Sequence, residues 1–348
     1  MKKVAYIEID THAEIAQAFM EITRGSKEFD IDYYFSKKIR DQISESGETV
    51  FLSDSSMITD QLKMKKYDLV IIGTLHRYFN TFLAIAEKYN TSVIVHNINF
   101  TKASKLDLLK SVFKGDIIYR LKLWWKEGLF YSPKTYRKAK NLLVLDKELS
   151  SPSYQFLPLF YTKSFTETKN ENITIVIPGG VSQKRRDYHR IFNIIRNIES
   201  SGKFSFVFLG KAIDEELKQL EKLSDTLSEG VSITYFTERV SSADFEKWMQ
   251  KADVLWCPIQ AETEFFSRKE KYGSTKMTGN LGDAIQYGKF AVFPADYSSE
   301  LSFIVPEEEN VIEQFRNLRT HHFDFQENYN RKKVQQEIEQ VINGLIST

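Results

Sequence analysis

The sequence predicts an α/β protein built from two doubly wound domains. Short apolar runs alternate with amphipathic helical stretches along most of the 348 residues, a pattern typical of parallel sheets in β-α-β units. Most of these runs are continuously apolar, as expected for strands that helices cover on both faces. The length is sufficient for two domains of ordinary size, each with its own core.

The expected strands form two series, separated by a stretch rich in Ser, Pro, Thr and charged residues over 150–172. Such a composition is typical of an interdomain linker. The first series comprises 3–9, 31–35, 49–52, 68–72, 92–96 and 142–145, and the second comprises 173–177, 204–209, 232–235, 254–258 and 290–293. We therefore predict domains over 1–165 and 166–323, followed by a polar helix within 324–348.

Composition excludes several classes of protein. The net charge is +1, so no global signature of nucleic-acid binding exists. Cys257 is the only cysteine, which excludes an intramolecular disulfide framework and predicts a buried core residue. The N-terminus has no signal-peptide pattern, and no run of about 18 apolar residues predicts a membrane span. We expect a cytoplasmic protein.

The most informative stretch is KMTGNLGDAIQYGKFAVF, residues 276–293. It predicts a helix that begins at Lys276 and carries Asn280 and Asp283 on the same face. Gly279 would let a ligand approach the backbone closely. A lysine at a helix N-terminus suits a phosphate, and Asp283 suits sugar or ribose hydroxyls. The alternative is an amphipathic helix with an ordinary polar face.

This stretch resembles the donor-site helix of bacterial nucleotide-sugar glycosyltransferases of the GT-B type, with a donor site similar to glycosyltransferase family 4. The matching residues are Asp283, Ala284, Gly288, Ala291, Val292 and Phe293. Phe290 replaces the usual proline, and Thr275 stands where the family carries its first acidic residue. The resemblance implies two Rossmann-like domains facing across a cleft. Residues 1–165 would receive the acceptor, 166–323 would bind the donor, and 324–348 would return to the first domain.

A glycine turn opens the second predicted domain. Gly179 and Gly180 follow its first strand, and the basic residues Arg185 and Arg186 come shortly after. Such a turn exposes backbone amides beside the switch point of the sheet, and arginine adds bidentate phosphate contacts. Because the turn lacks a GxGxxG fingerprint, a dinucleotide is disfavoured. The turn resembles the first donor-side loop of bacterial glycosyltransferases of this fold, in which a basic residue touches the diphosphate. Arg186 is the preferred residue; the alternative is a solvated, basic helix start.

Three of the six histidines, His12, His76 and His96, follow strands of the first domain. Because ligands bind at the carboxyl ends of strands in open α/β sheets, these side chains are expected to meet at one edge. His96 also fits a structural role at a strand end. In the family fold this edge faces the arriving acceptor hydroxyl. We therefore expect His12 to act as the acid–base group, oriented by Asp10.

The sequence after Asp10 also permits a purely structural interpretation. Thr11 would be the N-cap of the following helix, with Glu14 three residues later in a capping box.

The segment 102–140 holds eleven Lys or Arg against three acids, a local net charge of +8. Its interleaved aromatic residues are Phe113, Tyr119, Trp124, Trp125, Phe130, Tyr131 and Tyr136. A basic and aromatic surface of this kind attracts an anionic membrane. The alternative is that Trp124 or Trp125 packs inward. Nucleic acid suits the charge as well, but no recognition module accompanies it.

The charged loop over 260–273 is either a mobile lid over the donor or a solvated connection. The sequence offers no convincing D-x-D metal pair and no Cys and His at metal-ligand spacing, so we expect a metal-independent reaction with no cofactor besides the nucleotide sugar.

The resemblance implies a glycosyltransferase that moves a sugar from a nucleotide-diphosphate donor to an acceptor hydroxyl. It places the reaction in surface-polysaccharide or lipid-linked glycan assembly, with the protein peripheral on the inner face of the cell membrane. Two alternatives remain open. One is a nucleotide-sugar 2-epimerase, which shares the fold and needs no acceptor. The other is a non-catalytic subunit that binds nucleotide.

Overall fold

A computed structural model describes residues 1–43, 47–113, 117–165, 171–198 and 202–347. The chain forms two compact units. Unit 1 comprises Met1–Phe160, Glu264–Met277 and Arg331–Thr348, and unit 2 comprises Tyr161–Thr263 and Thr278–Asn330. Residues 114–116 of the basic segment, 166–170 of the expected linker and 199–201 at the expected end of a helix lie outside the described residues.

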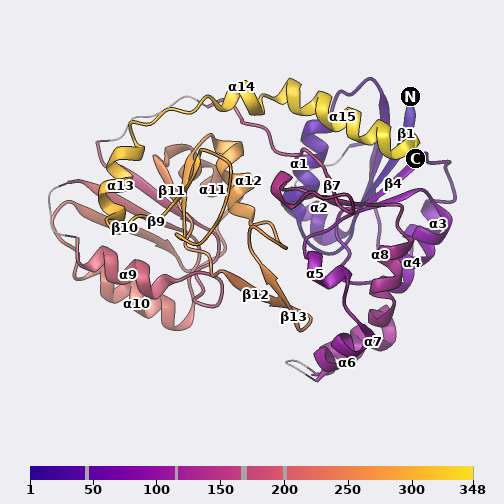
Figure 1. The fold of residues 1–348 in the computed structure, drawn as a ribbon, viewed down its shortest axis with the longest axis horizontal. Helices are drawn as coiled ribbons and strands as arrows, with labels where there is room; N and C mark the ends of the chain where they lie inside the picture. Colours follow the sequence, from indigo (N-terminus) through magenta and orange to yellow (C-terminus); the bar gives the residue numbers. More distant parts are fainter. Residues whose placement is uncertain (44–46, 114–116, 166–170, 199–201, 348) are drawn as a thin grey trace. The chain divides into compact units, whose positions relative to one another are not determined.

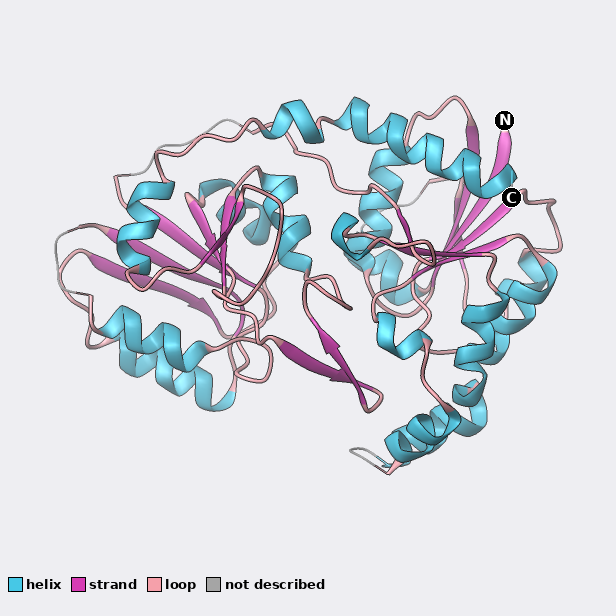
Figure 2. Ribbon diagram, viewed as in Figure 1, coloured by secondary structure: helices cyan, strands magenta, loops and turns pink. Residues whose placement is uncertain are grey.

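Unit 1 contains a parallel seven-stranded sheet in the order β3-β2-β1-β4-β5-β6-β7 (Figures 1 and 2). Its strands are β1 (Lys2–Glu8), β2 (Phe29–Phe35), β3 (Val50–Leu52), β4 (Leu69–Ile72), β5 (Thr91–Ile94), β6 (Asn141–Val144) and β7 (Gln155–Phe156). The chain moves outward from β1 in one direction and from β4 in the other. The switch point, where ligands bind in such sheets, therefore lies between β1 and β4.

Helices cover this sheet because their apolar stripes complete its core. The helices of unit 1 are α1 (Ala13–Thr23), α2 (Lys37–Ile43), α3 (Ile58–Gln61), α4 (Phe79–Lys88), α5 (Ile98–Thr101), α6 (Lys105–Val112), α7 (Ile117–Glu127), α8 (Ser132–Lys138) and α15 (Arg331–Ser347), with the short 3-10 helices η1 (Leu129–Tyr131) and η2 (Lys147–Leu149). The C-terminal helix α15 packs against α1, and α4 packs against α8 (Figure 1). Helices α6 and α7 extend away from the sheet.

Unit 2 contains a parallel six-stranded sheet in the order β10-β9-β8-β11-β14-β15. Its strands are β8 (Ile173–Pro178), β9 (Phe204–Lys211), β10 (Val231–Phe236), β11 (Val254–Trp256), β14 (Phe290–Phe293) and β15 (Ile304–Pro306). Its helices are α9 (Tyr188–Arg196), α10 (Asp214–Ser224), α11 (Ser242–Lys251), α12 (Gly279–Tyr287), α13 (Val311–Leu318) and α14 (Phe325–Tyr329). This strand order is that of a Rossmann fold, with its switch point between β8 and β11.

The expected loop over 260–273 is instead a hairpin of β12 (Glu262–Phe265) and β13 (Arg268–Lys271), and from Glu264 onward it belongs to unit 1. Phe265 and Phe266 pack against the unit 1 core. The Glu270 carboxylate accepts hydrogen bonds from the amides of Asn99 (3.2 Å) and Phe100 (2.9 Å) at the start of α5. Core packing by the two phenylalanines explains why this segment is ordered rather than a solvated connection.

The prediction of two doubly wound sheets is confirmed, and every expected strand is present within a few residues of its expected bounds. The strands that were not expected, β7, β12, β13 and β15, are all short. Cys257 is fully buried, as predicted. Among the helices of the described ranges, none has the length and apolar content needed to cross a membrane.

Candidate functional site

Buried Glu8 shapes the loop that leaves β1 at the switch point of unit 1. Its carboxyl group accepts hydrogen bonds from the Thr74 hydroxyl (2.6 Å) and from the amides of Asp10 (3.2 Å) and Thr11 (3.3 Å). The side chain is fully buried. Burial raises its pKa from 4.5 to about 8, although the hydrogen bonds oppose this shift. Glu8 therefore connects the loop after β1 to the loop after β4.

The three expected histidines meet beside these loops. The rings of His12 and His96 stack with centroids 4.1 Å apart and an interplanar angle of 10°. The His76 ring lies edge-on, 5.9 Å from His12 and 5.6 Å from His96. The His96 Nε2–H donates to the Gly73 carbonyl at 2.9 Å. Burial, reinforced by the charge of neighbouring groups, lowers the pKa of His76 and His96 well below 6.5, so both rings are neutral near pH 7.

His12 occupies an unusual backbone position. It is the N-cap of α1 in the left-handed region, with φ 63°, and its side chain makes no capping hydrogen bond. Non-glycine residues rarely adopt this conformation, and functional sites are enriched in such residues. His12 Nδ1 lies 2.9 Å from Glu14 Oε1. The expected capping box of Thr11 and Glu14 is wrong, because the helix begins two residues after Thr11 and Glu14 binds the histidine instead.

The expected orientation of His12 by Asp10 is also not observed. Asp10 Oδ1 lies 3.6 Å from an Arg77 guanidinium nitrogen. Arg77 makes two hydrogen bonds to Glu127 at the end of α7, of 2.9 and 2.5 Å. Burial raises the pKa of Asp10, and Arg77 opposes that shift. The acidic neighbour of His12 is therefore Glu14, while Asp10 belongs to an ion-pair network with Arg77.

Lys276 lies in unit 1 rather than on α12. Its ammonium group donates to Asn97 Oδ1 at 2.9 Å, and the Asn97 amide nitrogen lies 3.1 Å from Nε2 of His76. The expectation that Lys276 starts the helix is wrong because Thr278 is the N-cap of α12, its hydroxyl accepting from the Asn280 amide at 3.3 Å. A threonine in that position satisfies a free helix amide, which lysine cannot do.

The glycine turn of unit 2 follows β8 as predicted. Gly179 has φ 105°, a backbone conformation that favours glycine, and a Cβ there would lie 2.3 Å from an Arg186 guanidinium nitrogen. A Cβ at Gly180 would have no atom within 4 Å. The Asp187 amide donates to the Pro258 carbonyl after β11 at 2.8 Å. The turn is therefore fixed to the loop on the other side of the switch point.

Arg186, Asn280 and Asp283 form one hydrogen-bonded group beside that turn. The Arg186 guanidinium donates to Asn280 Oδ1 at 3.2 Å. The buried Asn280 amide nitrogen donates to Asp283 Oδ2 at 3.1 Å and to the Pro178 carbonyl at 3.2 Å. Gly279, the first residue of α12, has open space where a Cβ would stand. This arrangement presents a cation, a carboxylate and an open helix N-terminus at the carboxyl end of β8.

The structure thus brings together most of the site residues expected in unit 2. Arg185 is exposed and shares none of the side-chain contacts that join Arg186 to Asn280. Four further residues of unit 1 bond to the loops around the three histidines and were not predicted from the sequence: Glu8, Arg77, Asn97 and Glu127. Glu8 carried a readable signal, because it is the only charged residue in the apolar part of the central strand, VAYIE.

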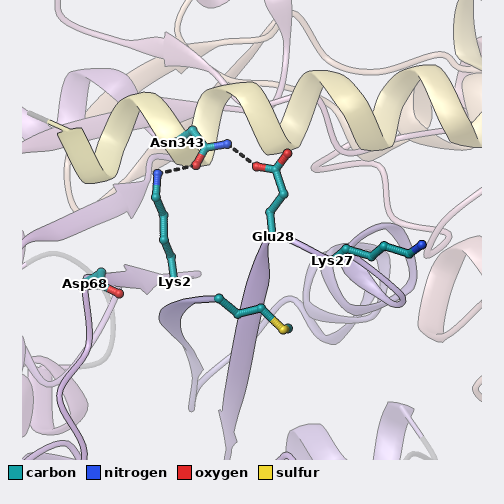
Figure 3. A pocket seen from close by; sticks show the side chains of 6 residues that line it. Lys2, Lys27, Glu28, Asp68 and Asn343 are labelled. Atoms are coloured by element: carbon teal, nitrogen blue, oxygen red, sulfur yellow. Dashed lines mark hydrogen bonds between the residues drawn. The ribbon is translucent and has the colours of Figure 1, made fainter.

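A large surface hollow of about 530 Å³ lies at the opposite, amino-terminal edge of the unit 1 sheet (Figure 3). Its lining includes Lys2 at the start of β1, Glu28 before β2, and Asn343 of α15. The Lys2 ammonium donates to Asn343 Oδ1 at 2.6 Å, and the Asn343 amide donates to Glu28. These bonds hold the C-terminal helix in place. Within the described residues, no group of His, Cys, Asp and Glu side chains is arranged to hold a metal ion.

The sequence matches no protein-family model and no curated protein significantly. Solved structures match along nearly the whole chain. Anabaena Alr3699/HepE in complex with UDP gives a TM-score of 0.61 at 12% identity, covering 99% of this chain and 100% of that chain. The complex of HepE with UDP-glucose gives 0.59 at 10% identity, with the same coverage.

Two further structures extend this comparison. UDP-GlcNAc 2-epimerase from Neisseria meningitidis, bound to UDP-GlcNAc, gives a TM-score of 0.55 at 12% identity, covering 98% of this chain and 100% of that chain. An alpha-glucosyltransferase in complex with UDP and DNA gives 0.53 at 12% identity, covering 99% of both chains. Together with the two Rossmann-type sheets, these similarities define the protein as one with the GT-B fold. At such low identity the similarity concerns the fold alone.

Proposed function

We propose that this protein is a glycosyltransferase that moves a sugar from a nucleotide-diphosphate donor to an acceptor hydroxyl. The observation that carries the proposal is the group formed by Arg186, Asn280 and Asp283 beside the Gly179–Gly180 turn. It lies at the switch point of a Rossmann-type sheet, where phosphate-containing ligands bind. HepE, whose fold is similar, has been solved with UDP and with UDP-glucose.

In this proposal Arg186 and the amides at the start of α12 hold the diphosphate. A guanidinium group binds phosphate oxygens in a bidentate manner, and a helix N-terminus adds its positive dipole end. Asp283 accepts hydrogen bonds from donor hydroxyls, and Asn280 holds both Arg186 and Asp283 in position. Gly180 and Gly279 leave space for the ligand. The fixed positive groups stabilise the leaving diphosphate without a metal ion.

In this proposal the acceptor side is the histidine group of unit 1, which is formed by His12, His76 and His96. His12 is the proposed base for the acceptor hydroxyl, because its ring is half-buried and its Nδ1 is held by Glu14. Neutral His76 and His96 enclose it. The hydrogen bond from His12 to Glu14 leaves Nε2 as the nitrogen available to accept a proton. The proposed acceptor is a growing glycan or lipid-linked sugar on the cytoplasmic face of the membrane.

A donor screen tests this function first. The 348-residue protein is heated with UDP-glucose, UDP-GlcNAc, GDP-mannose and the matching free nucleosides. A ligand that binds only the folded state raises its melting temperature, with a gain of about 2.7 kcal/mol at a concentration 100 times Kd. We expect at least one nucleotide sugar to stabilise the protein where its free nucleoside does not. Stabilisation by none of them would contradict the donor site.

The similarity to an epimerase supports a second candidate. Unit 1 carries the buried acidic residues Glu8 and Glu127 and the half-buried Asp10 near the switch point, and inversion at a sugar carbon needs acid–base groups of this kind. Incubating the protein with the stabilising nucleotide sugar alone distinguishes the two. A transferase leaves the sugar configuration unchanged, whereas an epimerase converts it at C2 without any acceptor. A non-catalytic subunit would bind the donor and yield neither product.

A further inference from the structure

Helices α6 and α7 of unit 1 expose an unusual amount of apolar surface. Ile118 is 83% exposed and Trp125 is 89% exposed, while Leu106 and Phe113 are 69% and 68% exposed. Most of the large hydrophobic side chains that are exposed in the described residues come from positions 106–131. Soluble proteins rarely gather such residues in one patch unless it binds something.

These side chains do not belong to an unfilled core. Leu108, Val112 and Leu123 are fully buried and attach the two helices to the unit 1 core. The helices extend away from the sheet beyond this attachment (Figure 1). The inward faces of α6 and α7 are thus already occupied, and Ile118 and Trp125 lie on faces that are left to solvent. The alternative in which Trp125 packs inward is therefore wrong.

The same surface is strongly basic. Lys105, Lys110, Lys122 and Lys126 are all exposed on α6 and α7. The acids of the two helices are engaged inside unit 1: Asp107 lies 3.2 Å from a guanidinium nitrogen of Arg268, and buried Glu127 binds Arg77. These carboxylates therefore pair with arginines rather than with the exposed lysines, and the charge on the exposed surface of the two helices is positive.

We propose that α6 and α7 form a docking surface for an anionic lipid bilayer. Apolar and indole side chains enter the boundary between headgroups and acyl chains, while lysines reach the anionic headgroups along their flexible stems. Branched apolar residues such as Ile118 and Leu106 suit an acyl boundary, whereas the sugar–phosphate backbone of a nucleic acid offers them no apolar partner.

This surface is connected to the candidate acceptor site within unit 1. Helix α7 ends at Glu127, which binds Arg77 in the loop after β4, and Arg77 also lies 3.6 Å from Asp10. His76 of the histidine group immediately precedes Arg77 in the sequence. A bilayer bound at α7 would therefore lie one loop away from His12 and its neighbours. This inference rests on the proposed function and deepens it, because it makes the acceptor a lipid-borne hydroxyl.

The test is flotation of the 348-residue protein with two kinds of vesicles, phosphatidylcholine alone and phosphatidylcholine mixed with phosphatidylglycerol. We expect binding to the mixed vesicles that declines with added salt, because charges at a surface are screened over about 8 Å at physiological ionic strength. The Ile118→Ala/Trp125→Ala variant should bind the mixed vesicles at least about tenfold more weakly, since two exposed apolar side chains no longer enter the bilayer. The Lys122→Glu/Lys126→Glu variant should show a similar loss.

Matched controls come from another surface of unit 1. Met64 is 82% exposed and Lys66 is exposed, so Met64→Ala and Lys66→Glu should leave vesicle binding unchanged. The proposal is overturned by equal binding of wild type and the Ile118→Ala/Trp125→Ala variant. It is also overturned if that variant has a lower melting temperature than the wild type. Binding of DNA but not of mixed vesicles would overturn it too, as would self-association of the protein through this surface.

The two proposals fail separately. Nucleotide binding, measured without vesicles, should be the same for wild type and the α7 variants because its proposed contacts lie in unit 2. Vesicle binding without nucleotide binding would retain the docking surface and reject the glycosyltransferase. Nucleotide binding without vesicle binding would reject the docking surface and retain the proposed donor site.

Discussion

His12 combines several features of an acid–base residue: a left-handed backbone at the switch point, a hydrogen bond to Glu14 and stacking on His96. Replacing His12 with Ala should slow sugar transfer by about 10²–10⁴-fold, the usual contribution of general acid–base catalysis. Donor affinity should stay close to that of the wild type, because the proposed donor contacts lie in unit 2. Steady-state kinetics together with donor titration of the same preparation measures both quantities.

His76→Ala and His96→Ala are the matched controls. Their rings are neutral and engaged with Asn97 and the Gly73 carbonyl, so they should alter turnover less than His12→Ala. Near-normal turnover of His12→Ala, combined with a loss in either of the others, would transfer the catalytic role to that histidine. Full activity of all three variants would leave the group purely structural.

Glu8 makes the stability of unit 1 depend on pH. Its pKa is about 8 in the folded protein and 4.5 ordinarily, so the folded state holds a proton that the unfolded state releases between these values. Its contribution to stability is therefore fully present below pH 4.5 and is lost as pH rises through about 8. Each unit of pKa difference corresponds to about 1.4 kcal/mol.

Glu8→Gln should remove this dependence, because glutamine keeps the shape and does not titrate. We expect the urea midpoint of unit 1 to decline between pH 5 and 8.5 in the wild type and to decline less in Glu8→Gln. The exposed Glu229→Gln in unit 2 is the control and should follow the wild type. Parallel curves for wild type and Glu8→Gln would show that Glu8 is ionised throughout this range.

At the scale of elements, the turn after β8 offers a matched pair of glycines. Gly180→Ala adds a methyl group in open space, whereas Gly179→Ala places one against Arg186 at a positive φ. Gly180→Ala should keep the melting temperature of the wild type but weaken nucleotide-sugar binding by about tenfold or more, since the methyl group would occupy the proposed ligand space. Gly179→Ala should lower stability by about 1–3 kcal/mol from backbone strain, with the steric clash adding to it.

Gly47→Ala controls for the substitution itself, because it also has open space around it but lies in unit 1. Calorimetric titration and thermal unfolding of the three variants give the two readouts. Unchanged affinity in Gly180→Ala would show that the donor does not approach this turn.

Most elements of the two large sheets were predictable because most of their strands are apolar runs followed by a helical pattern. The start of α12 was not predicted correctly. Both Lys276 and Thr278 precede the apolar stripe of α12. Which of them begins the helix depends on which side chain can accept a hydrogen bond from a free backbone amide of the first turn. The hairpin of β12 and β13 was missed because its strands, ETEF and RKEK, are mostly charged. The hairpin is held in place by Phe265 and Phe266, which pack on residues distant in sequence. The spacing of apolar residues along the chain does not reveal such contacts.

At the scale of the whole molecule, unit 1 is assembled from three separate stretches of chain. The expected linker over 150–172 includes the position near residue 160 at which the chain first passes from unit 1 to unit 2. The return at Glu264–Met277 carried no comparable signal, because it is fixed by tertiary contacts such as Glu270 with the amides of α5. For the same reason Lys276 and Asn280, close neighbours in sequence, belong to different units. The grouping of Arg186 with Asn280 and Asp283 in unit 2 was more predictable, because a glycine turn and the face of one helix are local signals.

The central claim is that Arg186 holds the diphosphate of a nucleotide ligand. It is tested most directly by calorimetric titration of UDP and uridine into wild type, Arg186→Ala and Arg185→Ala. Arg186 is bound to Asn280, whereas the adjacent Arg185 is exposed and serves as the matched control. A charge-assisted contact is worth about 1.5–3 kcal/mol, so Arg186→Ala should weaken UDP binding by about 10- to 150-fold. Uridine binding by Arg186→Ala, and UDP binding by Arg185→Ala, should be nearly unchanged. Equal UDP affinity of Arg186→Ala and wild type would contradict this account of the protein.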